Sequence, residues 1–388
     1  MNVKKAVENG FRRNTYAADW LYRHYHPERE EFISKTVRDF SQTDSLRDTE
    51  PLKRFKERIV NEKIPFWSYD INKTGSRMYG IHDSLFGSIS DREIFFPSAE
   101  HGLIFHNKNW SDTQNTVRAS CVTFGKFRKE VLEKFYSTPI FCVGPYIHYA
   151  EDYYDEETFS RIKERLGKNL LVFPTHGTDD AKITYSEKCF SAKIDELRKA
   201  YDSVTVCVYW WNLDDPIINK FKEKGYHIVS AGYREDPKFL SRLKAIIDLC
   251  DQSIGDGIGT NIGYCLSRGK PFAYFDSETE KEDFNQTDNE DRLFVKKHMD
   301  ILKDVFREAY FIKERQLEAA DYYWGLNQIK TREELYGIYS INKKITVACR
   351  GNAGKYAEYA RKLLNDKTAL EDIEYKLLQE GMKNADTV

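Results

Sequence analysis

The sequence predicts an α/β protein with two domains, each built on a parallel, doubly wound sheet. Three observations support this fold class. From residue 168 to residue 275, short apolar runs alternate with amphipathic helical runs, which is the pattern of successive β–α–β units. A less regular version of this alternation occupies the first half of the chain. The length of 388 residues and the hydrophobic share of 40% are sufficient for two cores of ordinary size.

The elements of the second half have clear starts and stops. A helix begins after the Asp-Pro pair at 215–216 and ends at Gly225, and another ends at Gly269, two residues before Pro271. The predicted strands are 170–176, 204–211, 226–232, 252–254 and 272–275, and the predicted helices are 186–201, 215–225, 237–250 and 261–270.

The first half fits the same class less regularly. Its predicted strands are 64–71, 92–102, 119–125 and 138–147, with a helix at 126–136. A helical, charged segment precedes these strands, and 150–169 contains a linker helix. At the end of the chain, 369–385 is predicted to form a charged helix. The predicted domains are therefore 1–155, an α/β domain with a helical N-terminal segment, 165–340, a second α/β domain, and 341–388, a helical tail.

Composition excludes several classes of protein. Sixty Lys and Arg residues balance 62 Asp and Glu residues, so no overall positive field attracts nucleic acid. The seven cysteines are scattered without metal-ligand spacing, which predicts reduced thiols, no metal site and a cytoplasmic location. No stretch approaches the length of about 18 apolar residues that crosses a membrane, and the N-terminus lacks an apolar signal segment.

The predicted fold also indicates where in the chain the functional residues lie. Two Rossmann-like domains in tandem place the carboxyl ends of their strands across a cleft, and ligands bind outside those ends. The segments that follow predicted strands are 100–102 and 144–150 in the first domain and 174–178, 231–235 and 255–261 in the second. We expect the active site among them.

One of these segments, GDGIGTNIGYCLSRGKPFAYFD at 255–276, raises the question of a dinucleotide cofactor. Asp276 lies nineteen residues after Gly257, at the distance expected of a ribose-binding acid. However, the spacing of Gly257, Gly259 and Gly263 is one residue longer than the usual fingerprint, and the preceding CDQSI is polar and short for a central parallel strand. The stretch is also the fourth strand-to-helix turn of its domain, not the first.

The same segments resemble those of the two-domain GT-B glycosyltransferases that build bacterial capsule and lipopolysaccharide O-chains. The resemblance covers roughly residues 90–280 and rests on EHG (100–102), GPYIHYA (144–150), LLVFPTHGT (170–178) and GTNIGYCLSRGKPF (259–272). It implies that the first domain binds the acceptor and the second a nucleotide-activated sugar, without a metal or another cofactor. PTHGT departs from the Pro-Ser-His-Ser of that family, so the donor stays open.

On the donor side, the start of the helix at 261–270 is the expected phosphate site. The first N–H groups of a helix and the positive end of its dipole favour a phosphate, and small residues allow it to approach. The residues concerned are Gly257, Gly259, Thr260 and Asn261. A tight turn with an ordinary helix cap is the structural alternative.

His176 is the predicted catalytic residue of the donor side. It follows a strand and precedes a glycine, so its ring N–H can reach the donor phosphate and stabilise the departing nucleotide. The other predicted donor contacts are Thr175, Gly177, Thr178, Tyr233 and Arg234. Core or surface packing is the alternative for each of them.

On the acceptor side, Glu100 and His101 are the candidates for the general base that takes the proton of the acceptor hydroxyl. An ordinary exposed acid is the alternative for Glu100. Tyr146 and His148 are expected to shape the hinge side of the cleft without a catalytic role. The acidic run at 276–292 is expected to be a solvated loop and not a metal site.

The predicted partners are a nucleotide-sugar donor and a glycan or lipid-linked glycan acceptor, with peripheral association at the cytoplasmic face of the inner membrane or with a polysaccharide assembly complex. Three other functions stay open. They are an NAD-dependent oxidoreductase, a nucleotide-sugar epimerase of the same architecture and a non-catalytic nucleotide-sugar-binding subunit.

Overall fold

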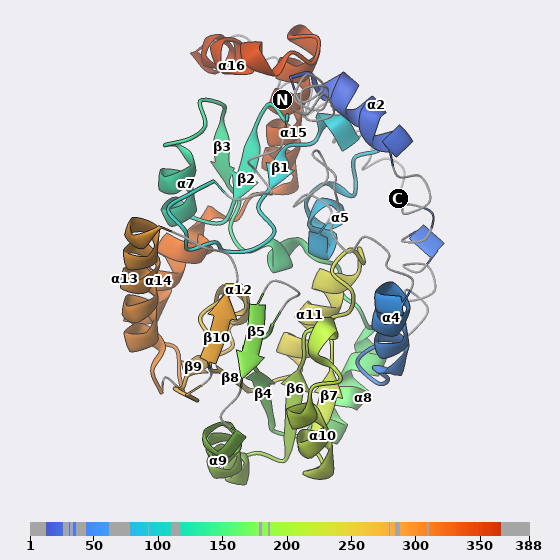
Figure 1. The fold of residues 1–388 in the computed structure, drawn as a ribbon, viewed down its shortest axis with the longest axis vertical. Helices are drawn as coiled ribbons and strands as arrows, with labels where there is room; N and C mark the ends of the chain where they lie inside the picture. Colours follow the sequence, from blue (N-terminus) through green and yellow to red (C-terminus); the bar gives the residue numbers. More distant parts are fainter. Residues whose placement is uncertain are drawn as a thin grey trace.

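The computed structural model shows two lobes stacked along the long axis of the molecule (Figure 1). The described residues are 13–25, 31, 34–35, 44–61, 78–91, 93–109, 117–177, 181–184, 187–278, 280–283, 288–308 and 310–365. The predicted strand at 64–71, the predicted helix at 369–385 and Thr178 lie outside them. We call the lobe around strands β1 to β3 the N-terminal lobe and the lobe around β4 and β6 to β9 the C-terminal lobe.

The C-terminal lobe is a parallel sheet of five strands in the order β7-β6-β4-β8-β9. The strands are β4 (Asn169–Phe173), β6 (Ser203–Cys207), β7 (His227–Val229), β8 (Gln252–Gly255) and β9 (Phe272–Tyr274). Counted along the chain, this order is 3-2-1-4-5, the order of doubly wound nucleotide-binding sheets. The α/β fold class and the five strands predicted for this part of the chain are confirmed.

Helices cover both faces of this sheet, as a doubly wound fold requires. Leu170 and Val172 of β4 pack in one core and Leu171 in the other, because successive side chains of a strand point to opposite faces. The first core includes side chains of α9 (Glu187–Leu197) and α10 (Pro216–Glu223), and the second those of α11 (Phe239–Asp248) and α12 (Thr260–Ser267). These four helices are the predicted ones.

Helix α4 (Glu50–Asn61) belongs to the C-terminal lobe although it precedes the N-terminal one in sequence (Figure 1). Leu52, Phe55 and Ile59 form an apolar stripe and are buried with Trp210 and Tyr233. The predicted charged helical segment is confirmed here, but its assignment to the first domain is wrong, since the stripe completes the core of the second.

The N-terminal lobe contains a small parallel sheet in the order β1-β2-β3. The strands are β1 (Ser98–Ala99), β2 (Cys121–Thr123) and β3 (Ile140–Cys142), with α5 (Ile81–Phe86) before them and α7 (Lys126–Leu132) between β2 and β3. Within the strand predicted at 92–102, Glu93–Phe95 form a 3₁₀ turn and Ser98–Ala99, directly after Pro97, pair with β2. Proline has no backbone N–H to donate to a strand partner.

Segments from both ends of the chain complete the N-terminal lobe. After α13 (Asn289–Phe306), helix α14 (Glu314–Trp324) packs on both α7 and α12, and α15 (Arg332–Ala348) and α16 (Tyr356–Asn365) lie beside α2 (Thr15–Tyr25) (Figure 1). Asn342 of α15 donates to the Phe95 carbonyl at 2.9 Å, and the Thr15 N–H donates to the Gly351 carbonyl at 2.8 Å. The predicted boundary at 340 is therefore wrong, because α15 crosses it as one buried helix.

Two further segments, 150–169 and 276–292, were predicted to be a linker helix and a loop. The linker helix predicted within 150–169 is α8 (Glu156–Leu166), whose Asp155 cap accepts from the Thr158 N–H at 2.7 Å. The acidic run at 276–292 is not a simple loop. Its residues Glu280–Asp283 form β10, which pairs antiparallel with β5 (Ala181–Thr184), and α13 starts within it.

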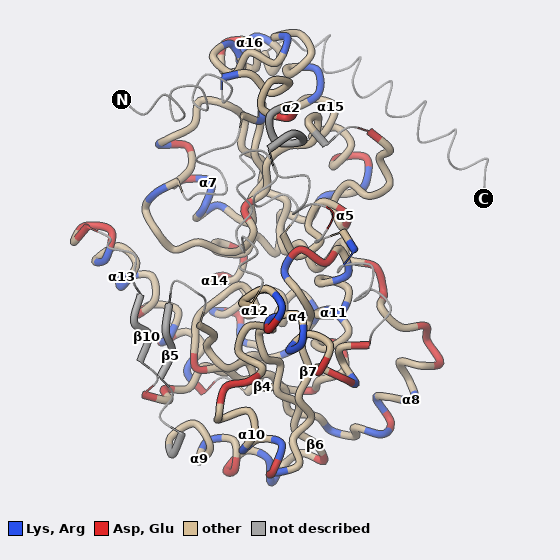
Figure 2. The backbone as a smooth tube through the Cα atoms, turned by 45° about the vertical axis from the view of Figure 1, so that its right-hand side comes forward, with Lys and Arg blue, Asp and Glu red and all other residues tan. Residues whose placement is uncertain are grey.

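Lys and Arg are interspersed with Asp and Glu over both lobes (Figure 2). Within the described ranges, no helix is long and apolar enough to cross a membrane.

Candidate active site

A cavity of about 470 Å³ lies between the lobes, at the carboxyl ends of β4, β6, β7 and β8. Its volume is in the range of small-molecule sites. The C-terminal lobe contributes the residues that follow these four strands, and the N-terminal lobe contributes Tyr79 and residues 101–104. The cavity therefore adjoins the point between β4 and β8 where the strand order reverses, which is where doubly wound sheets bind ligands.

The glycine loop and the start of α12 form one wall. Gly257, Gly259, Thr260 and Asn261 all line the cavity, as predicted. Gly259 is the N-cap of α12 and provides no side chain to cap the helix. A β-carbon at Gly257 would lie 2.5 Å from the Thr175 hydroxyl, so the glycine lets the loops after β4 and β8 approach each other. This wall presents backbone N–H groups and a helix dipole to the cavity.

Asp256, which the sequence analysis did not single out, holds three of these loops together. Its carboxylate accepts from the Thr175 N–H and from the Ser277 hydroxyl, each at 2.7 Å, and it is 9% exposed. The loops after β4, β8 and β9 are thereby connected through one side chain. An acid directly after a strand is the sequence feature that indicates such a role, but the glycines at 257 and 259 next to it predict a phosphate loop more strongly.

His176 lies at the cavity, where its exposed ring packs 4.5 Å from the ring of Tyr209, at an angle of 32°. Nδ1 is 3.3 Å from the Gly177 carbonyl oxygen. If Nδ1 carries the proton it donates to that carbonyl, and Nε2 is then an acceptor; a protonated imidazole donates from both nitrogens. Thr175 also lines the cavity, whereas Gly177 is buried behind it.

His101 is the imidazole that the N-terminal lobe contributes to the cavity wall among the described residues. It is partly buried, and its ring lies 6.0 Å from that of Tyr79. Two residues further on, the Leu103 N–H donates to the Thr260 hydroxyl of α12 at 2.9 Å. This bond joins the predicted acceptor segment directly to the predicted phosphate site.

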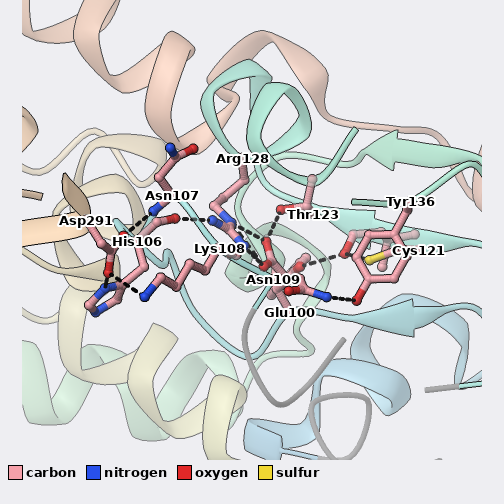
Figure 3. Close-up of polar contacts among 12 residues, drawn as sticks. Glu100, His106, Asn107, Lys108, Asn109, Cys121, Thr123, Arg128, Tyr136 and Asp291 are labelled. Carbon is pink, nitrogen blue, oxygen red and sulfur yellow. Dashed lines mark hydrogen bonds and ion pairs between the residues drawn. The ribbon is translucent and has the colours of Figure 1, made fainter. Parts of the chain in front are cut away.

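Glu100 does not line the cavity. Figure 3 shows it beside Arg128 and Thr123. Its fully buried carboxylate pairs with Arg128 at 2.6 Å and accepts from the Thr123 hydroxyl at 2.7 Å. The expectation that Glu100 is a general base of the cleft is corrected by this position, because both carboxylate oxygens are bound inside the lobe. An acid in front of a histidine after a strand is compatible with either role, and sequence gives no signal for the distant Arg128.

The same polar network connects the segment 100–109 to the rest of the protein (Figure 3). Arg128 donates to the His106 and Lys108 carbonyls at 2.8 and 3.0 Å. Asp291 of α13, which is 2% exposed, accepts from the Asn107 N–H at 2.8 Å and lies 2.6 Å from Nδ1 of His106. His101 therefore lies in a segment whose two ends, Glu100 and residues 106–108, are held by hydrogen bonds to Arg128 and Asp291.

Tyr233 and Arg234 are not cavity residues. Tyr233 is fully buried, 4.8 Å from Phe55 of α4 and 5.0 Å from Trp210 between ring centroids, and Arg234 is 3% exposed. The predicted donor contacts at these positions are corrected, because α4 covers this loop from outside. The carbonyl of Arg234 accepts from the Tyr79 N–H at 2.5 Å and so lies at the contact of the lobes.

Several residues that line the cavity were not predicted from sequence, among them Tyr79, Cys207, Tyr209, Phe239 and Tyr264. Burial raises the pKa of the Cys207 thiol to about 12, so this thiol is protonated at neutral pH and is a poor nucleophile. Burial also raises the pKa of Tyr264. The ring surfaces give the cavity an apolar, aromatic character beside its backbone N–H groups.

The described residues contain no group of three or more His, Cys, Asp or Glu side chains arranged to hold a metal ion. Asp276, the candidate ribose-binding acid, is exposed and does not line the cavity. In a dinucleotide site that acid stands near the end of the second strand. Here β6 is followed by Val208, Tyr209 and Trp210 instead.

No protein-family model matches the chain, and no curated protein matches it. The chain is similar to several solved structures. Arabidopsis thaliana UGT89C1 has 11% identity and a TM-score of 0.30 over 89% of this chain and 78% of its own. TcCGT1 in complex with UDP has 11% identity and a TM-score of 0.29, covering 70% of this chain and 58% of its own. UDP-glucose: anthocyanidin 3-O-glucosyltransferase in complex with UDP has 10% identity and a TM-score of 0.26, covering 84% and 74%. At these values the assignment of the fold rests on the sheet order of the chain itself.

Proposed function

We propose that the protein is a metal-independent glycosyltransferase that transfers a sugar from a nucleotide-activated donor to an acceptor hydroxyl. The observation that carries the proposal is the cavity between the lobes. The C-terminal lobe contributes the start of α12 and His176 to its wall, and the N-terminal lobe contributes His101. Phosphate-binding groups and a candidate base thus line the same cavity of about 470 Å³.

On the donor side, the phosphate attached to the sugar lies at the N-terminus of α12. The backbone N–H groups of Thr260 and Asn261 bind its oxygens, and the dipole of the helix favours its negative charge. His176, from the loop after β4, donates a ring N–H to the same phosphate. As the bond between the anomeric carbon and the phosphate oxygen breaks, these donors stabilise the charge of the leaving nucleotide.

On the acceptor side, His101 takes the proton of the attacking hydroxyl while the new bond to the anomeric carbon forms. We assign this role to His101 and not to Glu100, because the carboxylate of Glu100 is bound to Arg128 and Thr123. The bond between the Leu103 N–H and the Thr260 hydroxyl keeps the base and the phosphate site at a fixed separation.

The finer assignment follows from the resemblance of residues 90–280 to glycosyltransferases of bacterial surface polysaccharides. We propose a growing capsule or O-chain glycan, free or lipid-linked, as the acceptor. The protein then works in the cytoplasm or at the cytoplasmic face of the inner membrane, alone or with a polysaccharide assembly complex.

A second candidate is an NAD-dependent oxidoreductase, because the order 3-2-1-4-5 is also that of dinucleotide-binding sheets. Residues 208–213, which directly follow β6, include no acid for the ribose, and the glycines follow β8 and not β4. The observations therefore favour a nucleotide-sugar.

Thermal unfolding with UDP, GDP, CDP, CMP and NAD tests the proposal, followed by transfer from the corresponding labelled nucleotide-sugar. A ligand at 100 times its Kd stabilises the folded state by about 2.7 kcal/mol. We expect one pyrimidine or purine nucleotide to raise Tm, and the matched control Ser267→Ala, at the far end of α12, to keep that shift. Stabilisation by NAD alone would favour the oxidoreductase. Nucleotide binding without transfer or donor hydrolysis would indicate a non-catalytic subunit, and interconversion of free nucleotide-sugars would indicate an epimerase.

A further inference from the structure

Tyr79 has an unusual backbone conformation for a residue with a side chain. Its φ is 62° and its ψ is 15°, in the left-handed region that residues other than glycine, asparagine and aspartate seldom adopt. Such a conformation is strained and persists where surrounding structure enforces it, commonly at a ligand site. Tyr79 lines the cavity between the lobes.

The surrounding structure that enforces this conformation comes from the opposite lobe. The Tyr79 N–H donates to the Arg234 carbonyl at 2.5 Å. The next residue, Gly80, also has a positive φ, and a β-carbon there would overlap the carbonyl oxygen of Pro237. A glycine at position 80 therefore lets the segment Met78–Gly80 lie directly against the C-terminal lobe, and this contact directs the Tyr79 side chain into the cavity.

The ring of Tyr79 lies between a candidate catalytic group and a second aromatic ring. Its centroid is 6.0 Å from that of His101 and 4.6 Å from that of Phe239 on α11. Tyr79 is only partly buried, so part of the ring surface stays accessible from the cavity. An acceptor whose apolar face packs on this ring lies next to His101, the candidate base.

We propose that Tyr79 is a specificity-determining residue that binds a pyranose ring of the acceptor against its aromatic face. The apolar C–H face of a pyranose packs on the ring, and an adjacent hydroxyl then points to His101. The inference rests on the proposed function and adds to it the residue that recognises a cyclic sugar unit of the acceptor in place of an acyclic polyol.

Binding of model acceptors to the wild type, Tyr79→Phe and Tyr79→Leu tests this assignment. The probes are methyl β-D-glucopyranoside, the corresponding galactopyranoside and mannopyranoside, and sorbitol as an acyclic polyol, with the nucleotide from the Tm panel present. Saturation-transfer NMR reports which sugar protons contact the protein. We expect transfer to the axial C–H protons of a pyranoside in the wild type and in Tyr79→Phe, and none to sorbitol.

In Tyr79→Leu we expect the Kd of that pyranoside to rise roughly 3- to 10-fold, which is the size of a typical aromatic contact. The shift of Tm caused by the nucleotide should not change. Tyr310→Leu, at an exposed tyrosine outside the cavity, is the matched control and should bind as the wild type does.

Three results would overturn the inference. The first is an unchanged pyranoside Kd in Tyr79→Leu. The second is a smaller nucleotide-induced Tm shift in Tyr79→Leu with normal sugar binding, which would assign the ring to the donor base. The third is a wild type that binds no pyranoside. Each of them leaves the proposed function standing as long as the wild type binds the nucleotide and transfers or hydrolyses its sugar. A wild type that binds no nucleotide contradicts the proposed function itself.

Discussion

The two lobes have sheets of the same parallel type, but they are assembled from the chain in different ways. The five strands of the C-terminal lobe and the helices between them come from one continuous segment, Asn169 to Tyr274, with α4 added on the outside. The N-terminal lobe has a sheet of three short strands, and its core is completed by α2 from the start of the chain and by α15 and α16 from its end. A local pattern therefore specifies the C-terminal lobe, and long-range contacts specify the N-terminal lobe.

The largest effect that this comparison predicts is on the buried pair of the N-terminal lobe. Arg128→Met leaves the Glu100 carboxylate buried without its partner, which typically costs about 3–5 kcal/mol of stability. Urea unfolding measures this loss. The matched control is Lys296→Met, which breaks an exposed i,i+4 pair of α13 and should cost less than about 1 kcal/mol.

Replacing both charges, as in Glu100→Leu with Arg128→Leu, should recover part of the stability that Arg128→Met loses, because no uncompensated charge is then buried. Equal stability of Arg128→Met and Lys296→Met would contradict the description of the pair.

The next effect concerns the contact through which the lobes share a core. Gly263 of α12 lies against Trp324 of α14, and a β-carbon at position 263 would overlap the indole ring. Gly263→Ala should therefore destabilise the protein by about 1–3 kcal/mol, the usual cost of overpacking, although alanine is the better helix former. Ser267→Ala on the same helix lacks this clash and should change Tm little. A more stable Gly263→Ala protein would show that α14 does not pack here.

These contacts indicate what the sequence specifies and what it leaves open. The alternation from 168 to 275 predicts all five strands of the C-terminal lobe, because four of them contain apolar runs and each helix has its own start and stop. The polar β8 is predicted from its place between two helices. The pairing of β5 with β10 is not visible in it, since the partners lie about 100 residues apart and Glu280–Asp283 is wholly charged. The return of α15 to the N-terminal lobe depends on contacts such as Asn342 with the Phe95 carbonyl, for which no local pattern exists.

The same distinction applies to the site. Residues that were predicted from their position after a strand, such as His101, His176 and the loop at 257–261, lie at the cavity as expected. Residues whose surroundings come from elsewhere in the chain do not. Glu100 meets Arg128, and Tyr233 is covered by Phe55 of α4.

The smallest effect is expected at the base of the C-terminal sheet. Burial raises the pKa of Asp251, but the bonds from Lys163 and from the Asn169 N–H outweigh it, so that the pKa lies below its usual value. A carboxyl whose pKa is lowered by folding stabilises the protein above its unfolded pKa of about 3.9 and stops doing so as the pH falls through its folded pKa.

Asp251→Asn should therefore be less stable than the wild type by a constant amount above about pH 5, under about 1 kcal/mol for so exposed a pair. The difference should shrink below pH 4 in urea unfolding at a series of pH values. A difference that grows as the pH falls would contradict the sign of this shift.

The central claim is that the cavity between the lobes binds the phosphate of a nucleotide-sugar, with His176 as a donor to the leaving group. The most direct test is the turnover of His176→Ala at saturating donor, measured beside its melting curve. Loss of one such donor typically costs about 2.7–4 kcal/mol in the transition state, so we expect kcat to fall roughly 100- to 1000-fold with Tm nearly unchanged. Turnover close to that of the wild type would contradict the phosphate role of His176, and a collapsed melting transition would show that this histidine serves the fold instead.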